Sequence, residues 1–203
     1  GIFMWNWGLG GLLGKQVEYW EEERVVNLGE ILMTLMEVHG YELFIGGAFN
    51  GDPHPGNVLL LPDGRLGLID YGQVKRMTVD ERIRYAKLII AICRDDPKEI
   101  ARVLHDDLGV RTSKNDPEVM YRLAVFWHDR DTPDITLGLN VQLFMEEMER
   151  RDALVAMPES YVMAGRLSVL MRGMANAFGL RMGTAKAWRK YAEELLRREG
   201  VEF

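Results

Sequence analysis

Residues 49–75 read FNGDPHPGNVLLLPDGRLGLIDYGQVK and are the stretch in which the helical hydrophobic pattern of the chain breaks. Two short apolar runs, 58–61 and 66–69, flank the sequence Pro62-Asp63-Gly64-Arg65. An Asp-Gly pair between two such runs is a strong short-range signal for a β-hairpin. This segment therefore predicts a two-stranded hairpin.

The expected register of this hairpin places two polar side chains together. If Asp63 and Gly64 form a two-residue loop, antiparallel pairing puts Asn57 opposite Asp70. Directly opposed residues have Cβ atoms about 4.5 to 5.5 Å apart on one face of the ribbon. An amide oxygen and a carboxylate aimed at one point are hard ligands that suit Mg²⁺. We therefore predict that Asn57 and Asp70 are metal ligands.

The loop before the hairpin carries a second acid, Asp52, five residues before Asn57. Pro53 and Pro55 stiffen this loop, because each proline fixes its own φ and restricts its neighbour. Glycines such as Gly56 allow backbone to pass close to a ligand. The alternative is an ordinary hairpin with polar ends, since Asp-Pro, Pro-Gly and Asp-Gly are also common turn dipeptides.

The rest of the chain has helical periodicity with recognisable helix starts. We expect helices after Asn27, Thr78, Asp96 and Asp116, because a capping side chain precedes an apolar stripe or a proline at each. Further helices are expected at 139–151, 158–178 and 184–199, with a loop at 128–134. The predicted fold class is mainly α with a small β-hairpin.

Composition limits the possible functions. The 203 residues are 47% hydrophobic and 28% charged, with a net charge of −6, which excludes a disordered chain and offers no broad basic surface for nucleic acid. The single cysteine excludes a disulfide framework or a cysteine-rich zinc site and favours a reducing, intracellular compartment. Residues 1–27 stay unassigned, and we expect them to be the cut edge of a larger protein.

The order Asp-x-x-x-x-Asn, hairpin, Asp-aromatic-Gly resembles the catalytic half of protein-kinase-like phosphotransferases. More narrowly, GDPHPGN followed by LIDYGQVK resembles the UbiB/ADCK (AarF) atypical kinase-like family. The resemblance implies a protein-kinase-like C-terminal lobe (α+β) over residues 28–203. This lobe would consist of a catalytic loop and hairpin at 49–75 and a helical tail at 78–200.

The resemblance also implies roles for individual residues. Asp52 takes the position of the catalytic aspartate, and Asn57 and Asp70 take the Mg²⁺ positions. His54 stands where many protein kinases carry a lysine that touches the transferred phosphate. His54, Gly56, Asn57 and Asp70 are therefore expected to bind the cofactors, ATP and Mg²⁺.

The helical tail adds to this likeness, and a few positions depart from it. Arg166, Arg172-Gly173, Trp188 and the stretch 191–194 are similar to the family's C-terminal region. Asn50-Gly51 replaces the His-Ala that commonly precedes the catalytic aspartate, and Tyr71 replaces phenylalanine. None of these departures removes a ligand.

The N-lobe elements of the family have no counterpart in this sequence. We expect the missing N-lobe of the same protein to be the main partner, and this chain alone to be inactive. The family further implies quinone or other isoprenoid-lipid metabolism, a peripheral contact with membrane or lipid, and a mitochondrial or plastid location. No nucleic acid partner is expected.

Two other functions are compatible with the motif. One is a small-molecule kinase of the aminoglycoside or choline type, although Gln73-Val74-Lys75-Arg76 stands where those enzymes tend to have an acidic stretch. The other is a non-catalytic scaffold that binds nucleotide. The intact Asp52 argues against the scaffold, because a pure binder needs the metal ligands more than the base.

Overall fold

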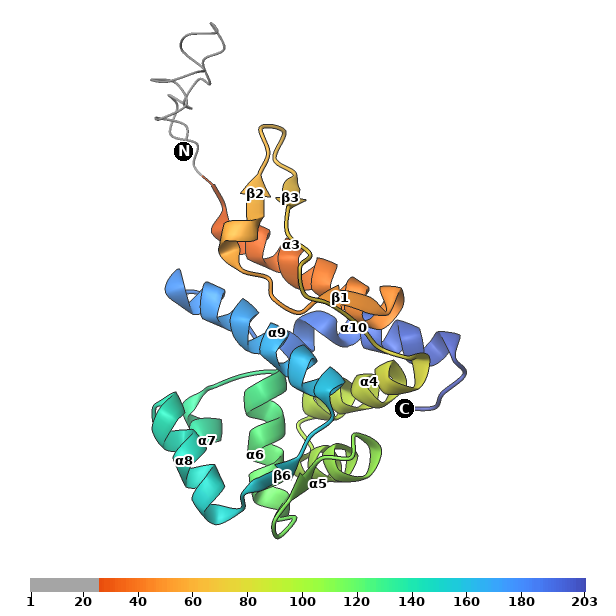
Figure 1. Cartoon of the computed structure of the whole chain (residues 1–203), viewed down its shortest axis with the longest axis vertical. Coiled ribbons are helices and arrows are strands. Elements are labelled where there is room, and N and C mark those ends of the chain that lie inside the picture. Colours follow the sequence, from red (N-terminus) through yellow and green to blue (C-terminus); the bar gives the residue numbers. More distant parts are fainter. Residues whose placement is uncertain (1–25) are drawn as a thin grey trace, which may run out of the picture.

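The computed structural model describes residues 26–203, so nearly all of the predicted N-terminal segment 1–27 lies outside the described residues. The described part is mostly helical with small antiparallel sheets, which confirms the predicted fold class (Figure 1). The helices are α3 (Leu28–Tyr41), α4 (Val79–Arg94), α5 (Pro97–Arg102), α6 (Pro117–His128), α7 (Pro133–Thr136), α8 (Val141–Arg151), α9 (Glu159–Ala177) and α10 (Thr184–Arg198). Shorter helical turns are η1 (Glu42–Gly46), η2 (Pro55–Asn57) and η3 (Val103–Asp107).

The helix starts follow their capping residues. Thr78 forms a full capping box with Glu81 at the start of α4. Asp96 and Asp116 each accept two backbone hydrogen bonds at the starts of α5 and α6. Side-chain acceptors satisfy N–H groups that have no partner within the helix, so these starts are fixed locally.

The prediction of a loop at 128–134 is wrong at both ends of that range. His128 is the last residue of α6, and the short helix α7 begins at Pro133. Proline favours the first turn of a helix because its missing N–H would have no partner there. Pro133 was therefore the signal for α7.

The core lies where α10 packs against α3 and α4. Trp188 of α10 is fully buried, and its Nε1 donates to the carbonyl of Met36 over 2.9 Å. Gly40 makes this approach possible, since a Cβ built there would stand 2.7 Å from the Trp188 ring. Phe44 stacks on Tyr85 of α4 with ring centroids 5.6 Å apart. These aromatic contacts fix α3, and with it the loop that follows, against the C-terminal helices.

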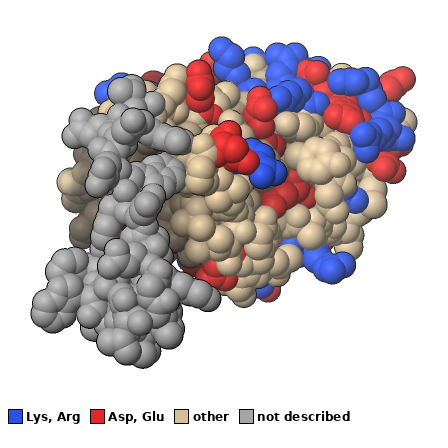
Figure 2. All heavy atoms as spheres, turned by 90° about the horizontal axis from the view of Figure 1, so that it is seen from above, with Lys and Arg blue, Asp and Glu red and all other residues tan. Residues whose placement is uncertain are grey.

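Charged side chains of both signs are interspersed on the face of the molecule shown in Figure 2. Exposed ion pairs one helical turn apart occur along the helices, as between Arg84 and Asp80 of α4 at 2.6 Å. Each such pair contributes only a few tenths of a kcal/mol (about 0.3 to 0.5), so the fold depends mainly on its apolar core.

The predicted hairpin exists, but its predicted register is wrong by one residue. Strands β2 (Val58–Leu60) and β3 (Leu66–Leu68) pair Val58 with Leu68, where the prediction paired Val58 with Ile69. The loop has three residues, closed by hydrogen bonds from Leu61 N to Arg65 O at 2.8 Å and from Gly64 N to Leu61 O at 2.9 Å.

Pro62 explains the longer loop. A two-residue type I′ turn needs positive φ at both central residues, whereas proline is held near −65° and suits the second position of a type I turn. Gly64 then takes the left-handed conformation with φ of 85°. Consequently Asn57 and Asp70 are not a directly opposed pair.

A second sheet was not predicted from the sequence. Strand β1 (Ala48–Asn50) pairs antiparallel with β4 (Val74–Arg76), so the residues just before Asp52 lie beside the residues just after Asp70-Tyr71-Gly72. A third small sheet joins β5 (Arg111–Thr112) to β6 (Leu154–Ala156). Within residues 26–203, no helix is both long enough and apolar enough to cross a membrane.

Candidate functional site

The side chain of Asn50 joins the two motif segments at their base. Asn50 is buried at the end of β1, and its Nδ2 donates to the carbonyl of Asp70 over 2.9 Å. Its Oδ1 accepts from the backbone N–H of Asp52 over 3.0 Å. One amide therefore fixes the backbone on both sides of the candidate site.

Gly51 allows the two segments to approach each other closely. Its N–H donates to the carbonyl of Gln73 over 2.9 Å, and a Cβ built at Gly51 would stand 3.2 Å from that same oxygen. A larger residue at position 51 would push the loop away from the segment that follows Asp70.

The carboxylate of Asp52 has partners on two separate segments. Nε2 of Gln73 donates to its Oδ2 over 3.4 Å, and the Arg166 guanidinium of α9 lies 3.4 Å from its Oδ1. The Asp52 side chain is 36% exposed, so solvent and small molecules still reach it. The predicted catalytic acid is thus oriented by a residue from the helical tail, which lies under the hairpin in Figure 1.

The backbone itself holds the ring of His54. Nδ1 of His54 accepts from the N–H of Gly56 over 3.0 Å, and the carbonyl of His54 accepts from the N–H of Asn57 over 2.8 Å. In a neutral imidazole whose Nδ1 accepts, the proton is on Nε2. The exposed His54 ring therefore offers one N–H donor, the group that a phosphate oxygen requires.

The predicted metal ligands are neighbours through the backbone. The carbonyl of Asn57 accepts from the N–H of Ile69, the residue before Asp70, over 3.0 Å. Oδ1 of Asp70 accepts from the N–H of Gly72 over 2.7 Å. Within the described residues, no hydrogen bond uses the second carboxylate oxygen of Asp70 or the Asn57 amide.

The chemistry of these donors fits Mg²⁺. Two hard oxygen donors with further positions left to water and phosphate are the set that this ion prefers. No group of three or more His, Cys, Asp or Glu side chains that could hold a metal gathers within residues 26–203, so an all-protein cage is absent there. That Asn57 and Asp70 bind Mg²⁺ stays a prediction.

Tyr71 takes the place of the usual phenylalanine and has an acidic neighbour. Partial burial raises the pKa of the Tyr71 hydroxyl, and the nearby Glu42 carboxylate raises it further. Glu42 also contacts Nδ1 of the buried His39 over 2.9 Å. The aromatic residue beside Asp70 is thus linked to the end of α3.

Sequence reasoning did not assign roles to Asn50, Gln73 or Arg166 in this site. From the sequence, Asn50 is only a departure from His-Ala, and Arg166 is only one residue of the family likeness. A polar residue at the end of an otherwise apolar strand was the available signal for Asn50. The Arg166 contact spans more than a hundred residues of sequence, and no local pattern predicts it.

The profile of a known family covers this site. Residues 10–104 match the ABC1 atypical kinase-like domain. This segment belongs to that family. The match contains the whole motif region 49–75, so the N-terminal half of the chain is similar to atypical kinases of the ABC1 (AarF/ADCK) type. It ends at residue 104, so the likeness of the tail beyond that point stays a prediction.

Individual relatives agree with the ABC1 assignment. An uncharacterized protein of Synechocystis sp. is 39% identical over 74 residues, which is 36% of this chain and 18% of that protein. Protein ACTIVITY OF BC1 COMPLEX KINASE 3, chloroplastic, of Arabidopsis thaliana is 26% identical over 101 residues, 50% of this chain and 14% of that protein. AarF domain-containing protein kinase 1 of Gallus gallus is 29% identical over 86 residues, 40% of this chain and 17% of that protein.

These alignments cover only a small part of the relatives. The chain spans less than a fifth of the length of each of these three relatives, with 18% the largest share among them. No solved structure matches the chain significantly.

Proposed function

We propose that the full-length protein transfers phosphate from ATP, or hydrolyses ATP, in a Mg²⁺-dependent reaction of the UbiB/ADCK type, and that this chain supplies its C-lobe. The observation that carries the proposal is the Asn50 bridge. It holds the loop of Asp52 and the segment of Asp70 at fixed backbone positions, 2.9 to 3.0 Å from one amide. Positioning of this kind is most of what phosphoryl transfer requires from a protein.

Each site residue has a role in the proposed reaction. Asp52 accepts the proton of the attacking hydroxyl or water, and Arg166 and Gln73 set the direction of its carboxylate. Asn57 and Asp70 hold Mg²⁺, and Nε2–H of His54 donates to a phosphate oxygen. Bound Mg²⁺ would neutralise the charge that develops on the phosphate oxygens.

The partners and substrate are proposals that rest on the family. The N-lobe of the same protein would close the nucleotide site, and the acceptor would belong to quinone or isoprenoid-lipid metabolism. Two of the matched Arabidopsis proteins are named chloroplastic, which favours a plastid among the organellar locations.

The test uses the full-length protein and measures ATP turnover with Mg²⁺. We expect Asp70→Ala to lower turnover at least a hundredfold, because a metal ligand is lost. Asp63→Ala is the matched control, since Asp63 lies in the same hairpin and pairs only with the exposed Arg65 within the described residues. Equal turnover in the Asp70→Ala and Asp63→Ala variants would contradict the proposal.

A second variant separates an enzyme from a scaffold. Asp52→Asn keeps the shape of the side chain but removes the base, so a phosphotransferase loses turnover while nucleotide binding stays unchanged. If cell function survives Asp52→Asn but not Asp70→Ala, the protein is a nucleotide-binding scaffold. Turnover of aminoglycosides or choline by the full-length protein would instead favour the small-molecule kinase.

The 203-residue chain itself should show no ATP turnover. A C-lobe without an N-lobe lacks the second wall of the nucleotide site, so ATP is not positioned. Detectable turnover by the purified chain that Asp70→Ala abolishes would overturn this expectation.

A further inference from the structure

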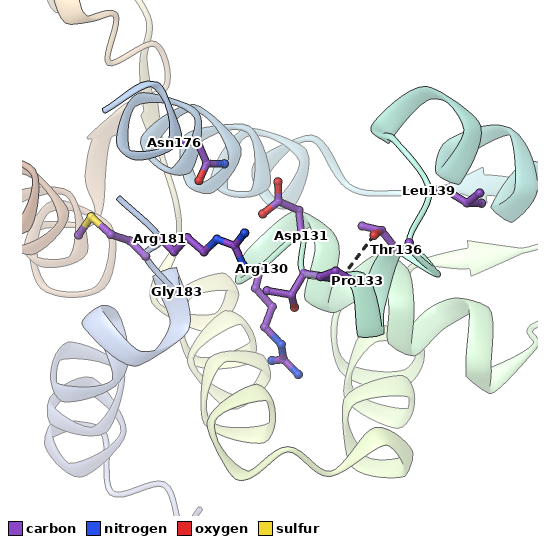
Figure 3. A pocket seen from close by; sticks show the side chains of 11 residues that line it. Arg130, Asp131, Pro133, Thr136, Leu139, Asn176, Arg181 and Gly183 are labelled. Carbon is purple, nitrogen blue, oxygen red and sulfur yellow. Dashed lines mark hydrogen bonds between the residues drawn. The ribbon is translucent and has the colours of Figure 1, made fainter. Parts of the chain in front are cut away.

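A hollow with several polar side chains in its lining lies among the C-terminal helices, outside the candidate kinase site. It has a volume of about 480 Å³ and lies between the segment that follows α6, the end of α9 and the segment before α10 (Figure 3). A hollow of this size accommodates a small metabolite. None of the motif residues 49–75 lines it.

Internal hydrogen bonds hold one wall of the hollow. Asp129 accepts from the N–H of Ala185 over 2.9 Å and from Arg130 over 3.0 Å, which ties the segment after α6 to the start of α10. Arg130 also donates to Asp95 over 3.2 Å. The Arg130 guanidinium is therefore occupied by acids of the protein, and in Figure 3 it points away from the hollow.

A buried cation behind the hollow is incompletely paired. Arg172 of α9 is only 4% exposed, and its Nη1 has no hydrogen-bond partner within the described residues. The nearest acid that pairs with it, Asp131, lies 3.6 Å from Nη1, which is beyond hydrogen-bond length. A buried charge without full pairing is costly, so an additional acceptor at this point would be favourable.

Two further donors line the same hollow. Within residues 26–203, the side chains of Arg181 and Asn176 make no hydrogen bond or ion pair. Figure 3 shows both directed toward Asp131 in the middle of the hollow. Asn176 lies four residues after Arg172 on α9, so these two side chains share one face of that helix.

From this arrangement we infer that the hollow is a binding site for a small phosphate monoester. The phosphate replaces the Asp131 carboxylate beside Arg172 and is held by Arg181 and the Asn176 amide. Donors from three directions match the several oxygens of a tetrahedral phosphate better than the two oxygens of a planar carboxylate. The Asp131 side chain is 40% exposed, so it can turn out into solvent when the phosphate enters.

The first test measures the binding of inorganic phosphate and of glycerol 3-phosphate to the 203-residue chain by calorimetry at constant ionic strength. We expect saturable binding that Arg181→Ala weakens about tenfold, which is the loss of one charge-assisted contact. Arg197→Ala is the matched control, because Arg197 is an exposed arginine of α10 outside the hollow, and it should leave affinity unchanged.

Asp131→Asn provides the sharper test because it predicts a gain. If Asp131 occupies the place of the phosphate, removing its negative charge should tighten phosphate binding several-fold. A simple loss of structure would weaken it instead. Circular dichroism of each variant verifies that the helices are intact.

Three results would overturn the inference. One is no saturable binding of either probe. Another is equal weakening by Arg181→Ala and Arg197→Ala, which would indicate unspecific attraction. The third is Arg181-dependent binding to phosphatidylcholine vesicles that contain phosphatidate, without binding of the soluble probes, which would identify a lipid headgroup as the ligand.

Discussion

Asn50 shows how a single buried amide can organise a site without touching a reactant. Its donor and its acceptor serve two different segments, and both of its bonds go to backbone atoms. The position of Asp52 therefore depends on residue 50 as well as on the prolines that follow it. Gln73, within the motif region, and Arg166, outside it, then contact the carboxylate itself.

At the scale of residues, the predicted chemistry of the site stays a prediction, whereas the predicted hairpin register is wrong by one residue. Asn57 and Asp70 are predicted metal ligands because an amide and a carboxylate oxygen suit a hard cation, and Asp52 is predicted as the catalytic acid from the family resemblance. The argument that placed Asn57 opposite Asp70 depended on loop length, and one extra loop residue changes the face of a paired side chain.

The Asn50 bridge predicts a loss of stability on truncation. Asn50→Ala removes two partly buried hydrogen bonds, to the N–H of Asp52 and to the carbonyl of Asp70, each of which contributes about 0.5–1.5 kcal/mol. Urea unfolding of the 203-residue chain would measure this change in the free energy of unfolding. Asn176→Ala, at an exposed asparagine of α9, should cause no such loss. Equal effects of the two substitutions would refute the bridging role.

At the scale of elements, local signals predicted the helices well. Thr78 with Glu81, Asp96 and Asp116 mark helix starts because their side chains satisfy free N–H groups within a few residues. The strands β1 and β4 were missed because three-residue strands carry almost no pattern of their own. Their pairing depends on tertiary contacts, which local periodicity does not encode.

Substitution of two glycines by alanine should change stability in opposite directions, because their backbone conformations differ. A Cβ at Gly64 or at Gly173 would meet no atom within 4 Å, so packing is not affected at either position. Gly64 has φ of 85° in the hairpin loop, and Gly64→Ala should therefore destabilise the hairpin by about 1 kcal/mol. Gly173 lies inside α9, and Gly173→Ala should stabilise the chain by about 0.5–1 kcal/mol.

Hydrogen exchange separates the two glycine effects. The N–H groups of Leu61 and Ile69 bond across the hairpin, so their exchange should become faster in Gly64→Ala and stay unchanged in Gly173→Ala. Unchanged exchange of both amides in Gly64→Ala would contradict the three-residue loop with a left-handed glycine.

At the scale of the whole molecule, the tail and the motif region form one packed unit. α10 packs against α3 and α4 through Trp188, and α9 reaches Asp52 through Arg166. The ABC1 match stops at residue 104, yet the helices beyond it bury the core on which the motif region rests. Removing the tail should therefore disturb the site even though the motif is complete without it.

The buried histidine of this core predicts how stability depends on pH. His128 is fully buried at the junction of α4, α6 and α9, and its Nδ1 contacts the Tyr85 hydroxyl over 3.0 Å. Burial, together with the positive charge of Arg172, lowers the pKa of His128 to about 3. The unfolded chain binds this proton near pH 6.5, whereas the folded chain does not.

The contribution of His128 to the free energy of unfolding should therefore be fully present above about pH 6.5. It should decrease as the pH falls from there toward 3, by up to about 1.4 kcal/mol per pH unit. Urea unfolding at several pH values would measure the slope. His128→Gln removes the titrating group and should flatten the slope in this range, whatever its effect on stability at pH 7. His105→Gln is the control, because His105 lies at the surface beside Asp106. This substitution should not change the part of the slope that His128 causes. If the slope of the wild type persists in His128→Gln, the buried histidine is not what makes the core sensitive to acid.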